Sequence, residues 1–453
     1  MSNQLWHLVG TVFDAEGFDA VATSLRAGHG ATLDGVRGSA SALVAAALAE
    51  RCSSTLVVVC AHPGDIDDFV DDLAVFTPRA ALKFPAWEAL DAECKFGDEL
   101  CGDRLRALKS LAAPQASRIL VTSIQSLVQP VPTPERIVGA TRRLAVGETL
   151  DVEALVRWLI EQGFQSTSAV ALPGELSIRG GILDLFAPDW LDPVRIELFG
   201  DQIESIRRFE VSAQRSLEVL DSIAITALGP ASGDRAHFAD HLPSGSWFML
   251  LEPGELEEEG RHYLGRVDDP AAFHTVSGAL RSVYRFPSVT AASLSIASME
   301  TTCRLKMESV ERFSGDIAKV RHELDTTGIG QQVYIVCQTE AEIHRLGTLC
   351  AETQLAREGK LHFLLGRLRA GFRLVIERIV LISGNELFHR ADVARPTRRR
   401  LGRVIDSFLE LREGDYVVHV AHGIGKYRGL KLVEVESQTE EHLELEFDGG
   451  TKL

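Results

Sequence analysis

The sequence predicts a multidomain α/β protein, and three observations support that prediction. With 453 residues, the chain has room for about three domains of roughly 150 residues each. In its first part, apolar strand-like runs alternate with helical patterns, which is typical of a parallel sheet covered by helices on both faces. From Leu176 the apolar residues recur at every second position, and beyond Gly414 the predicted strands are short and rich in turns.

The first α/β region is predicted from five consecutive segments. Leu33–Glu50 predicts a glycine-bearing turn that enters an alanine-rich helix, and Thr55–Cys60 has the composition of a buried strand. Helical patterns follow at Phe69–Phe76 and Arg104–Leu111, and Arg118–Thr122 is a further apolar strand. This order of strands and helices indicates a parallel sheet.

The change of period after Leu176 predicts an antiparallel sheet with one solvated face. Apolar and polar residues alternate along 178–183 and again along Val194–Phe199. Gly200 and Asp201 separate that run from the next one, at Ile203–Val211, and this pair favours a hairpin turn. A second domain is therefore expected at about residues 130–225.

The chain then returns to buried strands and helices. Trp247–Leu251 is an apolar strand that ends at Glu252, so we expect the first α/β domain to resume there. A small α/β unit follows, with predicted strands and one helix at Val333–Cys337, Glu340–Glu352, Leu361–Leu365 and Arg378–Ile382.

The last part of the chain contains a linker and a β-rich segment. Arg395–Arg403 is basic and contains proline, as solvated linkers do. Short strands are predicted at Tyr416–Val420, Leu430–Val435 and Leu443–Phe447, with a turn at His422–Gly425. This pattern favours a small β-barrel, and the sequence stops while its strands are still running.

Composition and charge exclude several classes of protein. The charged fraction of 25% and the hydrophobic fraction of 45% are average for soluble globular proteins, which excludes a disordered or collagen-like chain. The net charge is 47 − 64 = −17, and an acidic chain repels a phosphate backbone, so tight nucleic-acid binding by the chain as a whole is disfavoured. Because the start of the sequence lacks a signal peptide and no run of about 18 apolar residues follows, we expect a cytoplasmic protein without membrane contact.

The seven cysteines are scattered, and none forms a C-x-x-C pair. This spacing favours buried free thiols over disulfides or a zinc site. They are Cys52, Cys60, Cys94, Cys101, Cys303, Cys337 and Cys350.

A degenerate phosphate loop opens the first predicted helix. Its residues are Gly35, Gly38, Ser39, Ala40, Ser41 and Ala42. The motif G-x-x-x-x-G-K-[ST] needs a lysine for the β and γ phosphates and a hydroxyl for magnesium, whereas the last three positions here are alanine, serine and alanine. We therefore interpret the loop as a structural turn.

The magnesium-binding half of an ATPase site also lacks a residue that it needs. The strand that ends at Glu252 has Leu251 where the magnesium-binding aspartate is needed. Two defects in one site indicate an ATPase fold that is retained as a scaffold. We therefore predict no catalytic residue, no cofactor and no metal ligand in this chain.

The second domain carries arginine on the polar face of its predicted sheet. The candidate residues are Arg179, Arg195, Glu197 and Phe199, with Arg207 and Arg208 nearby. This face is either an ordinary solvated sheet face or a protein-binding surface, and Phe199 favours the second because Ile196 and Leu198 take the opposite face. DNA binding is disfavoured because Glu197 and Asp201 interrupt the positive charge.

Two blocks of sequence resemble domains of known families. Leu176–Phe186 followed by Val194–Ile206 closely resembles the domain by which the excision-repair protein UvrB binds UvrA, a block that also occurs in the bacterial transcription-repair coupling factors, the Mfd family. Gly414–Leu430 resembles the RNA-polymerase-interacting domain that those factors share with CarD-type regulators. Phe84–Glu88 and the degenerate phosphate loop are also similar to that family.

The resemblance implies a degenerate helicase-like parallel α/β domain with an inserted antiparallel α+β domain, a small α/β domain and a truncated SH3/Tudor-like β-barrel. The implied boundaries are 1–129 and 226–325 for the UvrB-like domain, 130–225 for the UvrA-binding type, 326–390 for the variable α/β domain, 391–411 for the linker and 412–453 for the incomplete polymerase-interacting domain. In full-length relatives ATP and magnesium belong to motor domains that follow, and DNA is contacted through them.

The same resemblance implies partners and contact residues. Arg179, Arg195, Glu197 and Phe199 would face UvrA. The strand Leu430, Lys431, Leu432, Val433 and Glu434 would pair with the polymerase β subunit by edge addition. We therefore expect a non-catalytic fragment of a coupling factor, which links stalled RNA polymerase to excision repair.

Three alternatives differ from this interpretation in class. A UvrB-like ATPase is opposed by Ser41, Ala42 and Leu251. A stand-alone CarD-like regulator would not need the long UvrB-like region. An unrelated metabolic α/β protein leaves both the Arg179 block and the Gly414 block unexplained.

Overall fold

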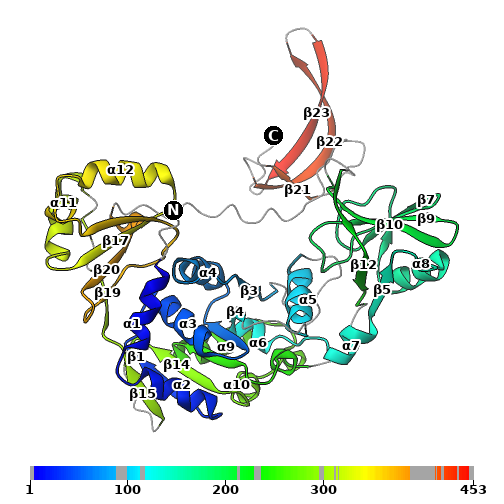
Figure 1. Cartoon of the computed structure of the whole chain (residues 1–453). Coiled ribbons are helices and arrows are strands. Elements are labelled where there is room, and N and C mark those ends of the chain that lie inside the picture. Colours follow the sequence, from blue (N-terminus) through cyan, green and yellow to red (C-terminus); the bar gives the residue numbers. More distant parts are fainter. Residues whose placement is uncertain are drawn as a thin grey trace. The chain divides into compact units, whose positions relative to one another are not determined.

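The structure is a computed structural model with two compact units, Met1–Arg395 and Pro396–Leu453, each of which is described by itself (Figure 1). It describes residues 5–87, 99–112, 118–211, 215–228, 236–294, 300–310, 313–314, 316–387, 414, 416–419, 423–435 and 438–447. The fold is mixed α/β, with one parallel sheet and several sheets that contain antiparallel pairs.

A seven-stranded parallel sheet forms the centre of the first unit, in the order β15-β1-β14-β13-β2-β4-β3. Its strands are β1 (Ala31–Asp34), β2 (Thr55–Cys60), β3 (Ala81–Phe84), β4 (Arg118–Ser123), β13 (Trp247–Leu251), β14 (Ser288–Ala292) and β15 (Thr301–Arg304). The prediction of a parallel sheet that resumes at Trp247 is confirmed. Strands far apart in sequence complete it because β13 inserts between β2 and β14.

Helices cover both faces of this sheet. One face carries η1 (Trp6–Leu8), α1 (Val9–Phe13), α2 (Phe18–Arg26), α3 (Ala40–Arg51) and α4 (Asp65–Phe76). The other carries α5 (Glu99–Ala112), α6 (Ile124–Val128), η2 (Phe238–His241), α9 (Pro253–Leu264), η3 (Pro270–Ala272) and α10 (Val276–Val283). Alternate residues of β2 point to the two faces, with Val58 in one core and Val57 in the other.

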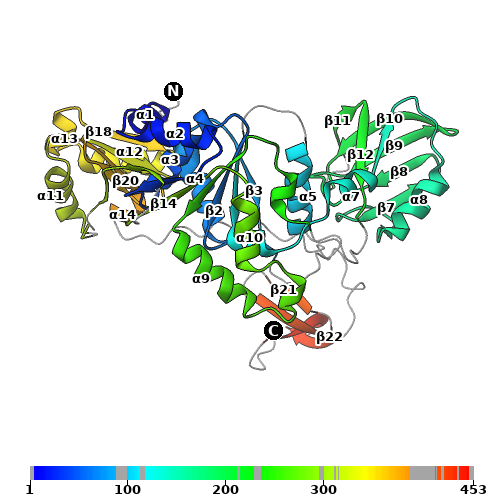
Figure 2. The ribbon, with the colours of Figure 1, turned by 90° about the horizontal axis from the view of Figure 1, so that it is seen from below.

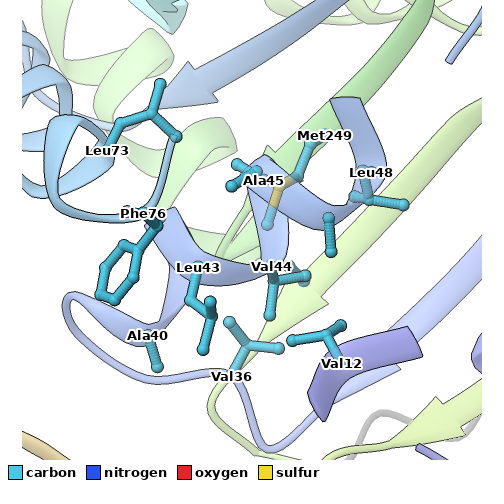
Figure 3. Packing of buried hydrophobic residues seen from close by; sticks show 14 of the residues in the cluster. Val12, Val36, Ala40, Leu43, Val44, Ala45, Leu48, Leu73, Phe76 and Met249 are labelled. Carbon is cyan, nitrogen blue, oxygen red and sulfur yellow. The ribbon is translucent and has the colours of Figure 1, made fainter. Parts of the chain in front are cut away.

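Helix α3 is buried along nearly its whole length, which explains its alanine-rich sequence. All residues from Ala40 to Ala49 are buried. Figure 3 shows Leu43 and Val44 of this helix packed with Val12 of α1 and Phe76 of α4. Small side chains allow the helix to approach the sheet and the neighbouring helices closely, because every face of it is covered.

The second domain interrupts the parallel sheet in sequence, between β4 and β13. Its larger sheet has the order β11-β10-β9-β8-β7-β6, of which Figure 2 labels β7 to β11. A separate antiparallel pair is formed by β5 and β12. The elements are α7 (Pro134–Gly139), β5 (Thr141–Ala145), α8 (Val152–Glu161), β6 (Gln165–Ser166), β7 (Glu175–Arg179), β8 (Ile182–Leu185), β9 (Val194–Phe199), β10 (Gln202–Phe209), β11 (Ser216–Leu220) and β12 (Ser222–Thr226). The predicted hairpin is confirmed: Phe199 pairs with Gln202, and Gly200 between them has φ of 62°.

Helix α5 fixes this second domain to the parallel sheet. Arg106 donates from Nε to the carbonyl of Asp189 at 2.9 Å, and Lys109 pairs with the carboxylate of the same residue. Lys109 also donates to Thr226 Oγ1 at 2.8 Å. Gly102 packs against the carbonyl of Pro188 so closely that no Cβ fits there. Polar bonds and close packing therefore act together at this junction.

A five-stranded mixed sheet forms the small α/β unit, in the order β16-β19-β20-β17-β18. Its elements are β16 (Met307–Ser309), α11 (Ile317–Thr327), β17 (Gln332–Cys337), α12 (Glu340–Cys350), α13 (Gln354–Arg357), β18 (Leu361–Leu365), β19 (Phe372–Leu374), β20 (Ile379–Ser383) and α14 (Gly384–Leu387). One face shares the hydrophobic core of α3 and α4, through Leu368 and Phe372 among others. The predicted linker at Arg395–Arg403 lies outside the described residues.

The second unit contains an antiparallel sheet of three strands, β21 (Tyr416–His419), β22 (Gly423–Val435) and β23 (Gln438–Phe447). The predicted turn at His422–Gly425 is wrong for Gly423–Gly425, which belong to β22. Gly425 pairs with Val417 and Phe447, and its missing side chain leaves room for the Phe447 ring. Glycine here serves strand packing and not a turn.

Two further predictions are tested by the described residues. Five cysteines are buried and free, as expected, namely Cys52, Cys60, Cys303, Cys337 and Cys350. The prediction of a free thiol is wrong for Cys101, which is disulfide-bonded, and Cys94 lies outside the described residues. Within the described ranges, no helix combines the length and the apolar character that a membrane span requires.

Candidate protein-binding face

One face of the six-stranded sheet carries the residues that the sequence singled out. The opposite face is covered by α8 and is apolar, with Leu155, Leu159 and Ile196 in its core. We call the other side the outer face. One row of paired residues crosses it through Ser177, Asp184, Arg195, Arg207 and Val219. A second row runs through Arg179, Ile182, Glu197 and Ser205.

Arg195 is held by a bidentate ion pair on this face. Its Nε and Nη2 donate to Asp184 Oδ1 and Oδ2 at 2.7 and 2.8 Å. The hydrogen bonds that Arg195 donates to Asp184 raise the pKa of Arg195 above its ordinary value. The guanidinium carbon also lies 4.9 Å from the ring centre of Phe209, which is buried. Paired geometry of this kind fixes the side chain in one orientation.

A second ion pair lies beside the first. Arg207 Nη2 donates to Glu197 Oε2 at 2.6 Å, and Ser205 Oγ donates to the same oxygen at 2.6 Å. Each carboxylate of the two rows, Asp184 and Glu197, is therefore bonded to an arginine of the outer face. The positive charge is locally compensated, which disfavours binding of a phosphate backbone and favours a partner with both signs of charge.

Phe199 is the most exposed large apolar side chain of this face. It ends β9 at the hairpin, and 80% of its surface is exposed. Ile182, on the same face, is 36% exposed. Arg179 pairs across the sheet with Ile182, and its side chain is exposed while donating to the carbonyl of Ser168. An exposed aromatic ring on a face that also carries arginine is typical of a protein-binding surface.

The structure therefore brings together Arg179, Arg195, Glu197 and Phe199 on one surface. Sequence reasoning missed Asp184 as the partner of Arg195. The alternation within β8 could have placed it on the polar face, because Leu183 and Leu185 point to the core. The strand register that sets Asp184 opposite Arg195 was needed to identify the pair.

Of the phosphate-loop residues, Gly35, Gly38 and Ser39 lie between β1 and α3, whereas Ala40, Ser41 and Ala42 belong to the first turn of α3. Gly35 and Gly38 have φ of 82° and 49°, a left-handed conformation that glycine adopts readily. Ser41 Oγ donates to the carbonyl of Gly38 at 2.6 Å, and Ala40 and Ala42 are buried. Ser39 is also buried and precedes the first turn of α3. Hydroxyl and methyl groups thus take the positions of the nucleotide-binding side chains.

Glu252 stands at the turn from β13 into α9. Its φ is 44°, and Oε1 accepts a hydrogen bond from the backbone N–H of Ser293 at 2.7 Å. This contact joins the ends of β13 and β14. The carboxylate therefore has a structural partner in the position where an ATPase would keep it available for magnesium and water.

The predicted polymerase-contacting strand, Leu430–Glu434, lies within β22. On one side its backbone pairs with β23, whereas β21 pairs only with Gly423–Lys426. Among the described strands, the other edge of Leu430–Glu434 is therefore left without a partner.

Comparison with known proteins assigns both regions to families. Residues 143–230 match the family model of the UvrB interaction domain. Residues 411–453 match that of the CarD-like/TRCF RID domain. Both matches fall on the blocks in which the sequence resembles transcription-repair coupling factors.

Curated relatives agree with these matches. The chain is 24% identical to the transcription-repair-coupling factor of Bacillus subtilis, over 93% of the chain and 44% of the relative. It is 28% identical to that of Mycobacterium bovis, over 91% and 42%, and 24% identical to that of Staphylococcus aureus, over 92% and 44%. The chain thus spans less than half the length of these relatives. The resemblance to transcription-repair coupling factors is confirmed.

Proposed function

We propose that this chain is a non-catalytic scaffold of a transcription-repair coupling factor, which recruits UvrA and binds RNA polymerase. The observation that carries the proposal is Phe199, 80% exposed on the outer face of the region that matches the UvrB interaction domain. Exposed aromatic and arginine side chains supply most of the binding energy in protein interfaces. The outer face is therefore the surface that we assign to UvrA.

The four predicted contact residues divide by role. Phe199 and Arg179 are exposed, so we assign direct contact to them. Arg195 is engaged by Asp184 through two hydrogen bonds, so it would contact a partner as part of that pair. Glu197, bonded to Arg207 and Ser205, orients the arginine beside the contact. Pairs that are already formed lose little entropy when a partner binds.

RNA polymerase is assigned to the second unit. The backbone of Leu430–Glu434 has a strand partner only in β23, and β21 leaves its other edge uncovered within the described sheet. An exposed edge of this kind accepts an added strand from a partner through main-chain hydrogen bonds. We propose the polymerase β subunit as the source of that strand, and closure of the β22 region into an SH3/Tudor-like barrel around it.

Neither ATP hydrolysis nor DNA binding is assigned to these residues. The phosphate loop lacks the lysine and the hydroxyl, and Leu251 replaces the magnesium-binding aspartate. The net charge of −17 opposes a phosphate backbone. We propose that translocation along DNA, with its ATP and magnesium, belongs to motor domains of the kind expected in full-length relatives.

Calorimetric titration of the chain with purified UvrA tests the assignment of the outer face. We expect Phe199→Ala to weaken binding by about tenfold or more, because an exposed aromatic at the centre of an interface is worth about 2 kcal/mol. Its unfolding should be unchanged within about 0.5 kcal/mol, since the ring has few contacts to lose.

Ile329→Ala is the matched control, because Ile329 is apolar and 75% exposed in the small α/β unit. Equal affinities of the wild-type chain, the control and Phe199→Ala would refute the assignment. No binding by the wild-type chain would leave only polymerase as the proposed partner. A pull-down with the polymerase β subunit would then show whether the second unit functions alone.

A further inference from the structure

The phosphate-loop remnant is in contact with a distant part of the same chain. Residues 366–372, which comprise the connection from β18 to β19 and the first residue of β19, lie against it, and we call them the docking segment. The backbone N–H of Ala370 donates to Ser39 Oγ at 3.0 Å. A Cβ on Gly38 would lie 3.4 Å from the Cβ of Ala370, so the methyl group of Ala370 packs beside Gly38. Over 300 residues separate the partners in sequence.

Charged residues of α4 complete the contact. Asp72 Oδ1 accepts a hydrogen bond from the backbone N–H of Arg369 at 2.7 Å, and the side chain of Arg369 pairs with Asp65 at 2.9 Å. Arg367 lies 3.8 Å from Asp71. Each arginine of the docking segment thus faces an aspartate on α4.

Apolar residues of the segment enter the core of the first α/β domain. Leu368 and Phe372 are buried in the cluster that contains Leu73 and Phe76. The rings of Phe372 and Phe76 lie with centres 6.1 Å apart. A segment that combines buried apolar side chains with polar bonds at its centre has the anatomy of a permanent interface and not of a passing contact.

The docking segment lies where a working phosphate loop would bind the phosphates of a nucleotide. In a working phosphate loop, the backbone between strand and helix and the N-terminus of that helix surround the phosphates. Here Ser39, the residue before α3, binds a backbone amide of the docking segment instead. The loop therefore already has an occupant that belongs to the chain.

We propose that the phosphate-loop remnant is an intramolecular binding site whose ligand is the docking segment, and that this contact joins the small α/β unit to the UvrB-like domain. The former nucleotide site thereby becomes an interface between two parts of the scaffold. This inference concerns residues remote in sequence from the outer face, and it does not depend on UvrA binding.

Hydrogen–deuterium exchange of the whole chain, read by mass spectrometry, tests the proposal. Ala370→Glu places a bulky carboxylate against Gly38 and beside Asp72, where both size and charge oppose docking. We expect amides in 36–44 and 366–372 to exchange at least about tenfold faster, while β17 and β20 keep their protection. Ala351→Glu is the control, since Ala351 is exposed at the end of α12.

Unchanged exchange at 36–44 in Ala370→Glu, with β17 and β20 protected, would overturn the proposal. If that variant loses protection in β17 and β20 as well, Ser39→Ala decides the matter. Ser39→Ala removes only the oxygen that accepts the hydrogen bond from the Ala370 amide. Faster exchange confined to the region of that amide supports docking, and unchanged exchange refutes it.

Titration of the wild-type chain with magnesium and ATP gives an independent result. We expect no saturable binding and no added protection at 36–44. Binding that protects this segment would show the loop to be free for a nucleotide, and the proposal would fail.

Discussion

Replacing Asp72 by asparagine tests the electrostatic cost of the contact between α4 and the docking segment. Asp72 is 1% exposed, and its Oδ2 makes no hydrogen bond within the described part of the chain. Burial raises the pKa of Asp72 from 3.8 to about 7, although Ser39 and Arg369 beside it act in the opposite direction. The folded chain therefore keeps this proton over a pH range in which the unfolded chain has lost it.

The sign and size of the effect follow from this difference. Excess protons on the folded state make the free energy of unfolding fall as pH rises, from the unfolded pKa near 4 to the folded pKa near 7. Between pH 5.5 and 7 the wild-type chain loses about 2 kcal/mol, at about 1.4 kcal/mol per pH unit. Asparagine is neutral throughout, so Asp72→Asn escapes this loss. The stability of the variant relative to wild type should be about 2 kcal/mol higher at pH 8 than at pH 5.5.

Urea unfolding at the two pH values, followed by tryptophan fluorescence, measures this difference. Trp247 is buried in the same core as α4, so its signal reports the relevant region. Equal m values for wild type and variant are required, because a chain of several units can unfold in steps. Asp268→Asn, at an exposed position, is the control substitution. A relative stability that is the same at both pH values would refute the reasoning, since Asp72 would then be ionised at both.

Two further predictions concern the second domain. Arg195→Ala should destabilise the chain by about 1–3 kcal/mol in thermal or urea unfolding, because it leaves Asp184 buried without its ion pair. The double variant Arg195→Ala, Asp184→Ala should recover part of this loss. Gly102→Ala should also destabilise, although alanine in a helix normally stabilises by about 1 kcal/mol relative to glycine, because the new Cβ meets the carbonyl of Pro188. A raised melting temperature for that variant would show that the junction can move apart freely.

Local patterns were sufficient to predict much of the first unit. Thr55–Cys60 and Leu361–Leu365 are strands with the expected bounds, because short apolar runs between turn residues have few alternatives in an α/β chain. The exposure of Phe199 followed from strict alternation along β9, since the period of two fixes the face of every residue. These features depend only on neighbours in sequence.

The features that sequence could not supply depend on register and on distant contacts. Asp184 pairs with Arg195 only because β8 and β9 align in one register. The contact of Ala370 with Ser39 requires the fold of two separate sheets. Gly425 lies in a glycine-rich stretch that favours a turn. A glycine is needed there within a strand because the ring of Phe447 occupies the space of a side chain. Local propensity carries no information on such pairs.

The lost lysine and the docked segment have one physical explanation. The positive charge of a lysine in a phosphate loop is compensated by the negative charge of the phosphates that it binds. Here the loop faces a neutral backbone amide, and Ser41, where the lysine would stand, is 7% exposed with its Oγ bonded to the carbonyl of Gly38. A buried ammonium without an anion costs several kcal/mol, so Ser41→Lys should lower the unfolding midpoint and should not create a nucleotide site. Gain of magnesium-dependent ATP binding by that variant would contradict this explanation, because it would mean that the docking segment yields to a nucleotide once the charge is restored.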